Sequence, residues 1–352
     1  MMLSELCNTI QPLDEQAMRM AQKRWDQIAK PLHSLGRLEE MIVQLAGIHR
    51  TADLQPRKKA VLIFCADNGI VAEGVTQTGQ EVTATVTENF TKGLATINTM
   101  AAVCDADVFP IDIGIAKDMQ CAGLDVRKVA YGTKNFAKEP AMTRTEAERA
   151  ILTGIELVKE KKLQGYNLII TGEMGIGNTT TSSAVFSVLS GLSPEMVTGR
   201  GAGLSSEGLH RKINLIQHAI TKYQPNPKDI LDVLSKVGGF DLCGMMGAFL
   251  GGAIYRIPIL IDGFISAVAA NCAVWFAPLC RDFLYATHCS AEPAGKLALD
   301  AIGMQAYLEC GMCLGEGTGA VIGAKLFDFA WAAYAEVADF HAAHVVPYQP
   351  LQ

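Results

Sequence analysis

Two glutamates in this chain stand inside glycine-rich segments. Glu173 lies in TGEMGIGNTTTSSA (171–184), and Glu316 lies in LGEGTGAV (314–321). Glycines that lead into a helix let the backbone approach a ligand, and the free N–H groups of the first helical turn bind anions such as phosphate. A carboxylate beside a bound anion could act as a general base, whereas either glutamate alone could also be a favourable partner for a helix dipole. Together the two segments indicate chemistry on a phosphorylated small molecule.

The segment from 172 to 180 differs from two common nucleotide-binding motifs. Asn178 and Thr179 stand where a nucleoside-triphosphate loop would carry Lys followed by Ser or Thr. Its glycines, at 172, 175 and 177, do not follow the G-x-G-x-x-G order of a dinucleotide-binding fingerprint. We therefore expect a phosphate site of another kind.

Short β-branched runs alternate with longer helical patterns along most of the chain. The expected buried strands are residues 60–67, 107–115, 166–172 and 257–262. The expected helices between them include residues 83–104, 143–162 and 241–255. This alternation predicts an α/β fold, with a Rossmann-like parallel sheet covered by helices on both faces. In such sheets ligands bind at the carboxyl ends of the strands, which is where the Glu173 segment begins.

The two ends of the chain have a different pattern. Residues 14–30 and 34–50 are helical in pattern without an intervening strand, and the tail after about residue 315 is again helical. We expect residues 1–55 to form a small helical subdomain, joined by C-terminal helices from about 325 to 352, and residues 56–324 to form the large α/β domain.

Composition and charge restrict the class of protein. With 352 residues, 49% of them apolar and 19% charged, the chain can bury a large core. Its net charge of -6 without a basic block argues against nucleic acid as a partner. The uncharged run 263–280 is just long enough for a membrane span, but its small residues and its position after a strand favour a buried helix. The first residues lack the regions of a signal peptide, which predicts a cytoplasmic location, and Cys310 with Cys313 alone makes a poor zinc site.

Longer motifs recur along nearly the whole chain. They are KPLHSLGRLEE (30–40), ADNGIVAEGV (66–75), GEMGIGNTT (172–180), GRGAGL (199–204), GGFDLCGMMGAFLGGA (238–253), PILIDGFISAVAA (258–270) and LGEGTGA (314–320). In type and order they resemble the nicotinate-nucleotide:dimethylbenzimidazole phosphoribosyltransferase family. The resemblance implies transfer of phosphoribose from nicotinate mononucleotide to an aromatic lower-ligand base of a cobamide, releasing nicotinate. It also implies a dimer, and no cofactor or metal, because phosphoribose leaves from a pyridinium.

The resemblance assigns roles to individual residues. Glu316 matches the family's catalytic glutamate and would be the general base that takes the acceptor's proton; Glu173 matches a second acid. The implied phosphate and ribose residues are Gly175, Gly177, Asn178, Gly203, Lys212, Asp262 and Ser290. The implied acceptor-base residues are Gln80, Thr83, Val86, Met174 and Leu314. Asp262 could equally fix a loop through a backbone amide, and His33 and His288 are given no catalytic role.

The acceptor is the least determined part of the resemblance. Asn68 stands where family members commonly carry His, and a proline usual near Gly79 is missing. A phenol or p-cresol acceptor, giving an O-glycoside, is therefore an alternative to a benzimidazole, and the active form could be a homodimer or a heterodimer with a paralogue. An inactive paralogue that supports an active partner, or a membrane-embedded scaffold, are the remaining alternatives.

Overall fold

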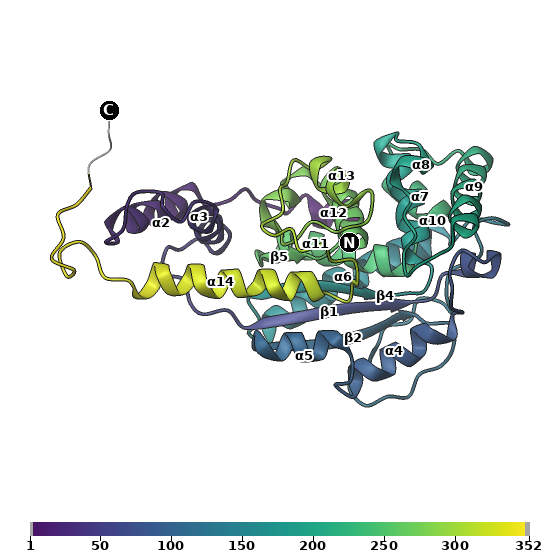
Figure 1. Cartoon of the computed structure of the whole chain (residues 1–352), viewed down its shortest axis with the longest axis horizontal. Helices are drawn as coiled ribbons and strands as arrows, with labels where there is room; N and C mark the ends of the chain where they lie inside the picture. The colour runs from purple at the N-terminus through teal and green to yellow at the C-terminus, as the bar shows by residue number, and fades with distance from the viewer. Residues whose placement is uncertain (1–2, 349–352) are drawn as a thin grey trace.

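Six parallel strands form one sheet in the order β3-β2-β1-β4-β5-β6 (Figure 1). The computed structural model describes residues 3–348. The strands are β1 (Lys59–Ala66), β2 (Ala106–Gly114), β3 (Asp125–Val126), β4 (Leu168–Met174), β5 (Ile259–Ile261) and β6 (Leu284–Ala286). This is the order of a doubly wound Rossmann sheet, whose strand order reverses between β1 and β4. The predicted parallel sheet is confirmed.

The central strands are apolar because both of their faces are covered. Every residue of β1 is buried, and its register places Val61 between Val108 and Ile170. Pro110 lies in β2 and has no N–H to donate to a neighbouring strand. The outer neighbour, β3, pairs only with Ile111 and Asp112 and does not extend to Pro110. The proline is therefore tolerated inside the sheet.

Helices pack on both faces of this sheet, as the sequence predicts. The large-domain helices are α4 (Glu81–Thr91), α5 (Thr96–Val103), α6 (Arg144–Leu163), α7 (Asn178–Ser190), α8 (Pro194–Val197), α9 (Ser206–Tyr223), α10 (Ile230–Val237), α11 (Phe240–Tyr255), α12 (Phe264–Phe276), α13 (Gly295–Asp300) and α14 (Thr318–Glu336), with short 3-10 helices η1 (Gly69–Glu73) and η2 (Pro278–Phe283). Phe64 of β1 packs against Gly244 in α11, whereas Val61 packs against Gly317 before α14. Because residues 61 and 64 point to opposite faces of a strand, α11 and α14 cover opposite faces.

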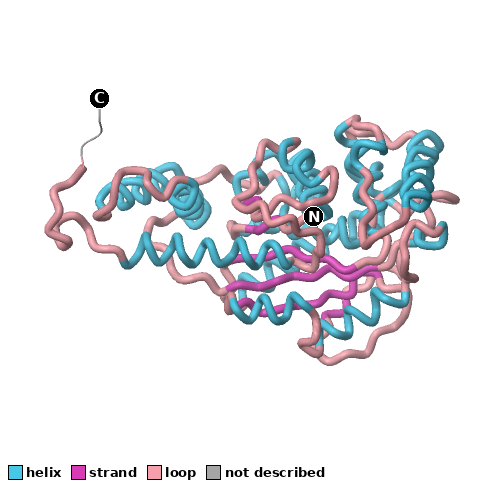
Figure 2. Tube along the Cα trace, viewed as in Figure 1, coloured by secondary structure: helices cyan, strands magenta, loops and turns pink. Residues whose placement is uncertain are grey.

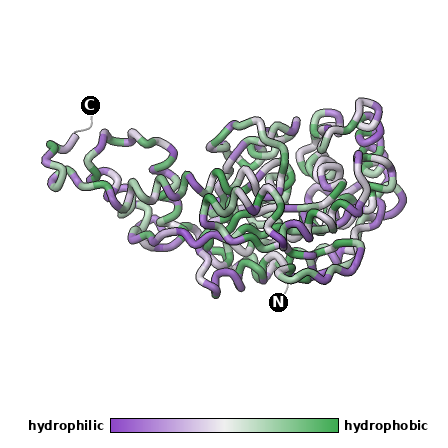
Figure 3. The backbone as a smooth tube through the Cα atoms, turned by 60° about the horizontal axis from the view of Figure 1, so that its bottom comes forward, coloured by the Kyte–Doolittle hydropathy of each residue, from purple (hydrophilic) through white to green (hydrophobic). Residues whose placement is uncertain are grey.

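The helical pattern over 83–104 is two helices and not one. Gly93 has φ +73 and interrupts the pattern between α4 and α5. Residues 263–280 form α12 and η2, and α12 is largely buried. Within residues 3–348, none of the helices combines the length and apolar character needed to cross a bilayer. Hydrophobic segments run through the centre of the molecule, and hydrophilic ones are frequent at its periphery (Figure 3).

Helices from both chain ends meet beyond the edge of the sheet. They are α2 (Glu15–Gln27), α3 (Arg37–His49) and the C-terminal part of α14, while α1 (Leu3–Cys7) is a separate short turn of helix. Trp25 is fully buried, with its ring 5.2 Å from that of Tyr334, and the Tyr334 hydroxyl donates to Ala52 O at 2.9 Å. Figure 2 shows only helices and loops at this end of the molecule.

The C-terminal contribution to this helical subdomain differs in part from the prediction. A single helix, α14, begins at Thr318 beside the sheet and ends at Glu336; residues 337–348 contain no further helix, and 349–352 lie outside the described residues. Ile28 and Asp339 form an antiparallel bridge, so the tail after α14 still pairs with the N-terminal segment. The domain boundary at residue 55 stays a prediction.

Candidate active site

A cavity of about 710 Å³ lies at the carboxyl edge of the sheet. It is lined by the loops that follow β4, β5 and β6, by the loop before α9 and by the loop before α14. Ten of the predicted site residues line it: Val86, Glu173, Met174, Gly175, Gly177, Asn178, Asp262, Ser290, Leu314 and Glu316. Four predicted site residues are not among its lining: Gln80, Thr83, Gly203 and Lys212. The position agrees with the general rule for ligand sites in open parallel sheets.

The two glutamate-bearing loops lie directly against each other. A Cβ on Gly172 would lie 2.6 Å from the carbonyl oxygen of Glu316, and a Cβ on Gly315 would overlap the Glu173 carboxyl group. Side chains at either glycine would therefore push the loops apart. The glycines allow the two acids to enter one cavity.

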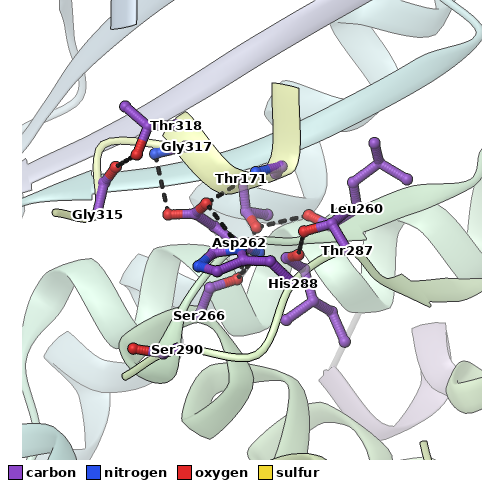
Figure 4. Close-up of polar contacts among 12 residues, drawn as sticks. Thr171, Leu260, Asp262, Ser266, Thr287, His288, Ser290, Gly315, Gly317 and Thr318 are labelled. Carbon is purple, nitrogen blue, oxygen red and sulfur yellow. Dashed lines mark hydrogen bonds and ion pairs between the residues drawn. The ribbon is translucent and has the colours of Figure 1, made fainter. Parts of the chain in front are cut away.

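Asp262 fixes the loop that carries Glu316. Its Oδ2 accepts the N–H of Gly317 at 3.1 Å, and its Oδ1 accepts the N–H of Ala320 at 2.9 Å (Figure 4). The Asp262 N–H donates to Ser266 Oγ at 3.1 Å, and Ser266 in turn contacts Thr171 Oγ1 at 2.7 Å. Asp262 is 3% exposed. Of the two roles open to it from the sequence, loop fixation is the one this geometry displays.

Glu316 itself has an unusual backbone conformation. Its φ of +62 lies in the left-handed region, which costs a side-chain-bearing residue roughly 1 kcal/mol or more. The Thr318 hydroxyl donates to Gly315 O at 2.7 Å and closes the loop around it. Oε2 of Glu316 is buried and has no hydrogen-bond partner. Burial raises the pKa of Glu316 above its usual value, and a backbone hydrogen bond from Ile97 opposes that rise.

Glu173 has a more strongly altered acidity. Burial, followed by the charges of Asp241 and Asp262, raises the pKa of Glu173 to about 8, against the hydrogen bond from Asn178. The Asn178 amide donates to Glu173 Oε2. Glu173 is therefore protonated at neutral pH. The Asn178 side chain is engaged with Glu173, so it is not a free donor to a ligand in this conformation.

The cation expected at the phosphate loop lies behind it. Lys212 is 1% exposed, and its Nζ donates to Thr179 Oγ1 at 2.8 Å and to Gly199 O at 3.1 Å. Gly177, with φ +91, directly precedes α7, so Thr179 lies in the first turn of that helix. Lys212 thus contacts the lining residue Thr179 without lining the cavity itself. Gly203 is exposed, and its carbonyl accepts a hydrogen bond from Gln77.

Two residues expected around the acceptor base support the loops. The Thr83 hydroxyl is fully buried and accepts the Ile176 N–H at 3.1 Å, and Gln80 Nε2 donates to Asn68 O at 3.0 Å. Asn68 is also buried, and its amide donates to Ile176 O at 3.4 Å. These contacts position the 175–177 loop. Val86, Met174 and Leu314, which the resemblance assigns to the acceptor, are apolar residues of the cavity lining.

Comparison with known proteins identifies the family. A family model described as phosphoribosyltransferase matches residues 10–345. This chain belongs to that phosphoribosyltransferase family. A protein of Ruminiclostridium cellulolyticum named nicotinate-nucleotide–dimethylbenzimidazole phosphoribosyltransferase is 48% identical over 354 residues, covering 100% of both chains. A protein of the same name from Acetivibrio thermocellus is 49% identical over 351 residues, covering 99% of each. The crystal structure of CobT from Thermus thermophilus has a TM-score of 0.90 and 39% identity, covering 95% of this chain and 100% of that one.

Several polar residues of this phosphoribosyltransferase cavity were not among the predicted site residues, and Arg200, His288 and Glu292 are those with basic or acidic side chains. His288 is 4% exposed, and its Nδ1 lies 3.9 Å from Asp262 Oδ1 (Figure 4). Its ring lies so close to Gly319 that a Cβ there would overlap it. His288 and Glu292 follow β6, which has only three residues. Recognising that short strand would have placed both residues at the site edge. Within residues 3–348, no group of three or more His, Cys, Asp or Glu side chains is arranged to hold a metal ion.

Proposed function

We propose that this chain transfers phosphoribose from nicotinate mononucleotide to an aromatic lower-ligand base, giving the α-riboside phosphate and nicotinate in cobamide assembly. The named relatives support the reaction class. The observation that carries the proposal is the meeting of Glu316, in its strained loop, with the glycine-rich turn at the start of α7 in one cavity. A benzimidazole such as 5,6-dimethylbenzimidazole is the proposed acceptor.

Glu316 is the proposed general base. The bond between C1′ and the pyridinium nitrogen breaks as the acceptor nitrogen bonds to C1′ from the opposite face, so the configuration inverts. The leaving nicotinate needs no proton, whereas the benzimidazole, which attacks through its unprotonated ring nitrogen, must lose the proton of its other ring nitrogen to give a neutral product. Glu316 takes that proton: its Oε2 has no competing hydrogen bond, and its raised pKa brings it nearer to that of the proton donor.

Glu173 has a different proposed role. A carboxyl group that is protonated at neutral pH cannot accept the acceptor's proton, but it can donate a hydrogen bond. Its neutrality also limits the number of negative charges that surround an incoming phosphate. We assign Glu173 to positioning of the substrates and Glu316 to proton removal.

The proposed phosphate site combines several groups. Gly175, Gly177 and the first turn of α7 offer backbone N–H groups, with Ser290 lining the same cavity. The Lys212 ammonium lies behind Thr179 and attracts the phosphate across that hydroxyl. The dimer and the cytoplasmic location stay predictions.

The departure at Asn68 does not itself favour a phenolic acceptor. Asn68 is fully buried and holds the loop at Ile176; it is not part of the cavity lining. The residues that we assign to the acceptor are Val86, Met174 and Leu314. They line the cavity and are apolar, which suits a flat aromatic ring. Phenols are therefore an outcome of the test and not a second proposal.

The test is nicotinate release from nicotinate mononucleotide by the purified chain, offered 5,6-dimethylbenzimidazole, adenine, phenol or p-cresol separately. Glu316→Gln should lower turnover by about 10²-fold or more. Glu309→Gln is a matched control, since Glu309 is exposed in the same loop region and does not line the cavity. Release only with phenols would keep the mechanism and change the acceptor. Activity only after mixing with a paralogue would show that the active form is a heterodimer and not a homodimer. Absence of nicotinate release under every condition would reject the proposal.

A further inference from the structure

Lys212 is a buried cation that contacts only neutral acceptors. Its Nζ donates to the Thr179 hydroxyl and the Gly199 carbonyl, and no carboxylate oxygen lies within 4 Å of it among the described residues. A buried ammonium group without an opposite charge is costly, and burial favours loss of its proton. Burial lowers the pKa of Lys212 to about 8. For Lys212 to attract the donor phosphate, a nearby negative charge must favour its protonated form before the phosphate binds.

The charged groups around Lys212 leave one candidate. On its own helix, Glu207 and Arg211 are exposed and pair with each other. On the preceding loop, the Arg200 guanidinium donates to Leu204 O and Ser206 Oγ. From α7, the group that contacts Lys212 is the neutral Thr179 hydroxyl. The segment after β6 offers Glu292, the one carboxylate that raises the pKa of Lys212 against the effect of burial.

Glu292 is built into the loop that Lys212 contacts. Its carboxyl group lies so close to Gly199 that a Cβ on that glycine would overlap Oε2. Gly199 is also the residue whose carbonyl accepts from Lys212 at 3.1 Å. Glu292 N–H donates to Ser290 Oγ at 3.3 Å, which anchors its backbone. The carboxylate and the ammonium therefore both pack on Gly199, close enough to attract but not paired.

We propose that Glu292 is a positioning residue that acts through Lys212: its carboxylate, packed on Gly199, is the fixed counter-charge that keeps the buried ammonium protonated and aimed at the phosphate loop. The inference rests on the proposed function, because the phosphate belongs to the donor nucleotide. A direct ion pair would neutralise the lysine and compete with the phosphate. A charge held at a greater distance supports the proton and leaves the positive charge of the ammonium to attract the anion beyond the Thr179 hydroxyl.

The direct test is titration of the lysine side chains by NMR, with ¹³C at Cε and the Lys212 signal assigned by its loss in Lys212→Arg. In the unmodified chain this signal should titrate near the pKa of about 8. In Glu292→Gln its midpoint should fall by about one pH unit. Glu207→Gln, which removes an exposed carboxylate from the same helix, should leave the midpoint unchanged. An unchanged or raised midpoint in Glu292→Gln would overturn the proposal.

Kinetics provide the second readout. At about pH 9, Glu292→Gln should raise the KM for nicotinate mononucleotide up to about tenfold, because a one-unit shift reduces the protonated fraction by that factor. At about pH 6.5 the KM should match that of the unmodified chain, and kcat should change little at either pH. Tighter donor binding in the variant would show instead that Glu292 competes with the phosphate. If the unmodified chain releases no nicotinate, the proposed function fails, but the NMR titration still decides the Lys212–Glu292 coupling.

Discussion

Asp262 accepts the backbone N–H of Gly317, the residue that follows Glu316, at 3.1 Å. The carboxylate at the end of β5 thus holds the start of α14, and with it the proposed general base. Asp262 also accepts the Ala320 N–H at 2.9 Å, so both of its oxygens satisfy amides of the first helical turn. The base is positioned by a strand end and not by a flexible loop alone.

Removing this anchor should impair catalysis. Asp262→Ala leaves two buried amides without an acceptor, each costing about 1–3 kcal/mol, and frees the Glu316 loop. We expect kcat to fall at least about tenfold, with a lower melting temperature. Asp300→Ala, which removes an exposed carboxylate paired with Lys296, is the control. Unchanged kcat in a folded Asp262→Ala variant would show that the loop holds its conformation without this aspartate.

The acidity of Glu173 should be visible in stability against pH. Its folded-state pKa of about 8 lies above the usual 4.5, so the folded chain binds this proton more tightly. Its contribution is fully present below the unfolded pKa and is lost as pH rises toward 8. Glu173→Gln removes this loss, so the variant should gain about 2–4 kcal/mol relative to the unmodified chain between pH 5 and 8. Urea unfolding at several pH values measures this difference. If the unfolding free energies of the two proteins changed with pH in the same way, the assigned protonation of Glu173 would be wrong.

The apolar rim of the cavity should act on one substrate only. Leu314 lines the cavity and is 55% exposed without a ligand. Leu314→Ala removes apolar surface that an aromatic acceptor would cover, which should raise the acceptor's KM about tenfold. The KM for nicotinate mononucleotide should stay the same. Leu94→Ala, at a leucine 71% exposed outside the cavity, is the comparison. A change in donor KM alone would place Leu314 on the donor side.

The helical subdomain should depend on one buried aromatic residue. Trp25 is 0% exposed and packs edge-on against Tyr334. Trp25→Ala should cost about 3–5 kcal/mol of unfolding free energy. Its Nε1 has no hydrogen-bond partner, so Trp25→Phe should cost much less. Denaturant unfolding of both variants, with Met20→Ala as an exposed control on the same helix, tests this. Equal losses for Ala and Phe would point to the indole nitrogen and not to packing.

The sequence predicts the parts of the fold that have a long, regular pattern. The strands β1, β4 and β5 appear as apolar runs because both of their faces are buried, and β2 is buried in its second half, Pro110–Gly114. β3 and β6, with two and three residues, exist through pairing with their neighbours; β5 is as short as β6, but it lies in the longer apolar run 257–261. The sequence analysis expected one helix across Gly93, although glycine is a weak helix former.

Most of the predicted site residues that line the cavity lie in the two glutamate-bearing, glycine-rich segments, and their roles stay predictions. Glu173 and Glu316 do enter one cavity. Thr83 and Gln80 lie near the site in sequence, but their hydrogen bonds to backbone groups, which no pattern reveals, turn them into supports for the 175–177 loop. Lys212 likewise does not line the cavity, because its ammonium group donates to the Thr179 hydroxyl and the Gly199 carbonyl. Depth within a site depends on tertiary contacts that sequence spacing does not encode.

The continuity of α14 gives the molecule a mechanical property. Its 19 residues form an unbroken rod about 28 Å long, with the Glu316 loop at one end and the Tyr334 contact with Trp25 near the other. A rigid rod cannot tilt at one end alone. A displacement of α2 and α3 would therefore be transmitted to the proposed general base, and the alignment of the candidate site is tied to the seating of the chain's two ends.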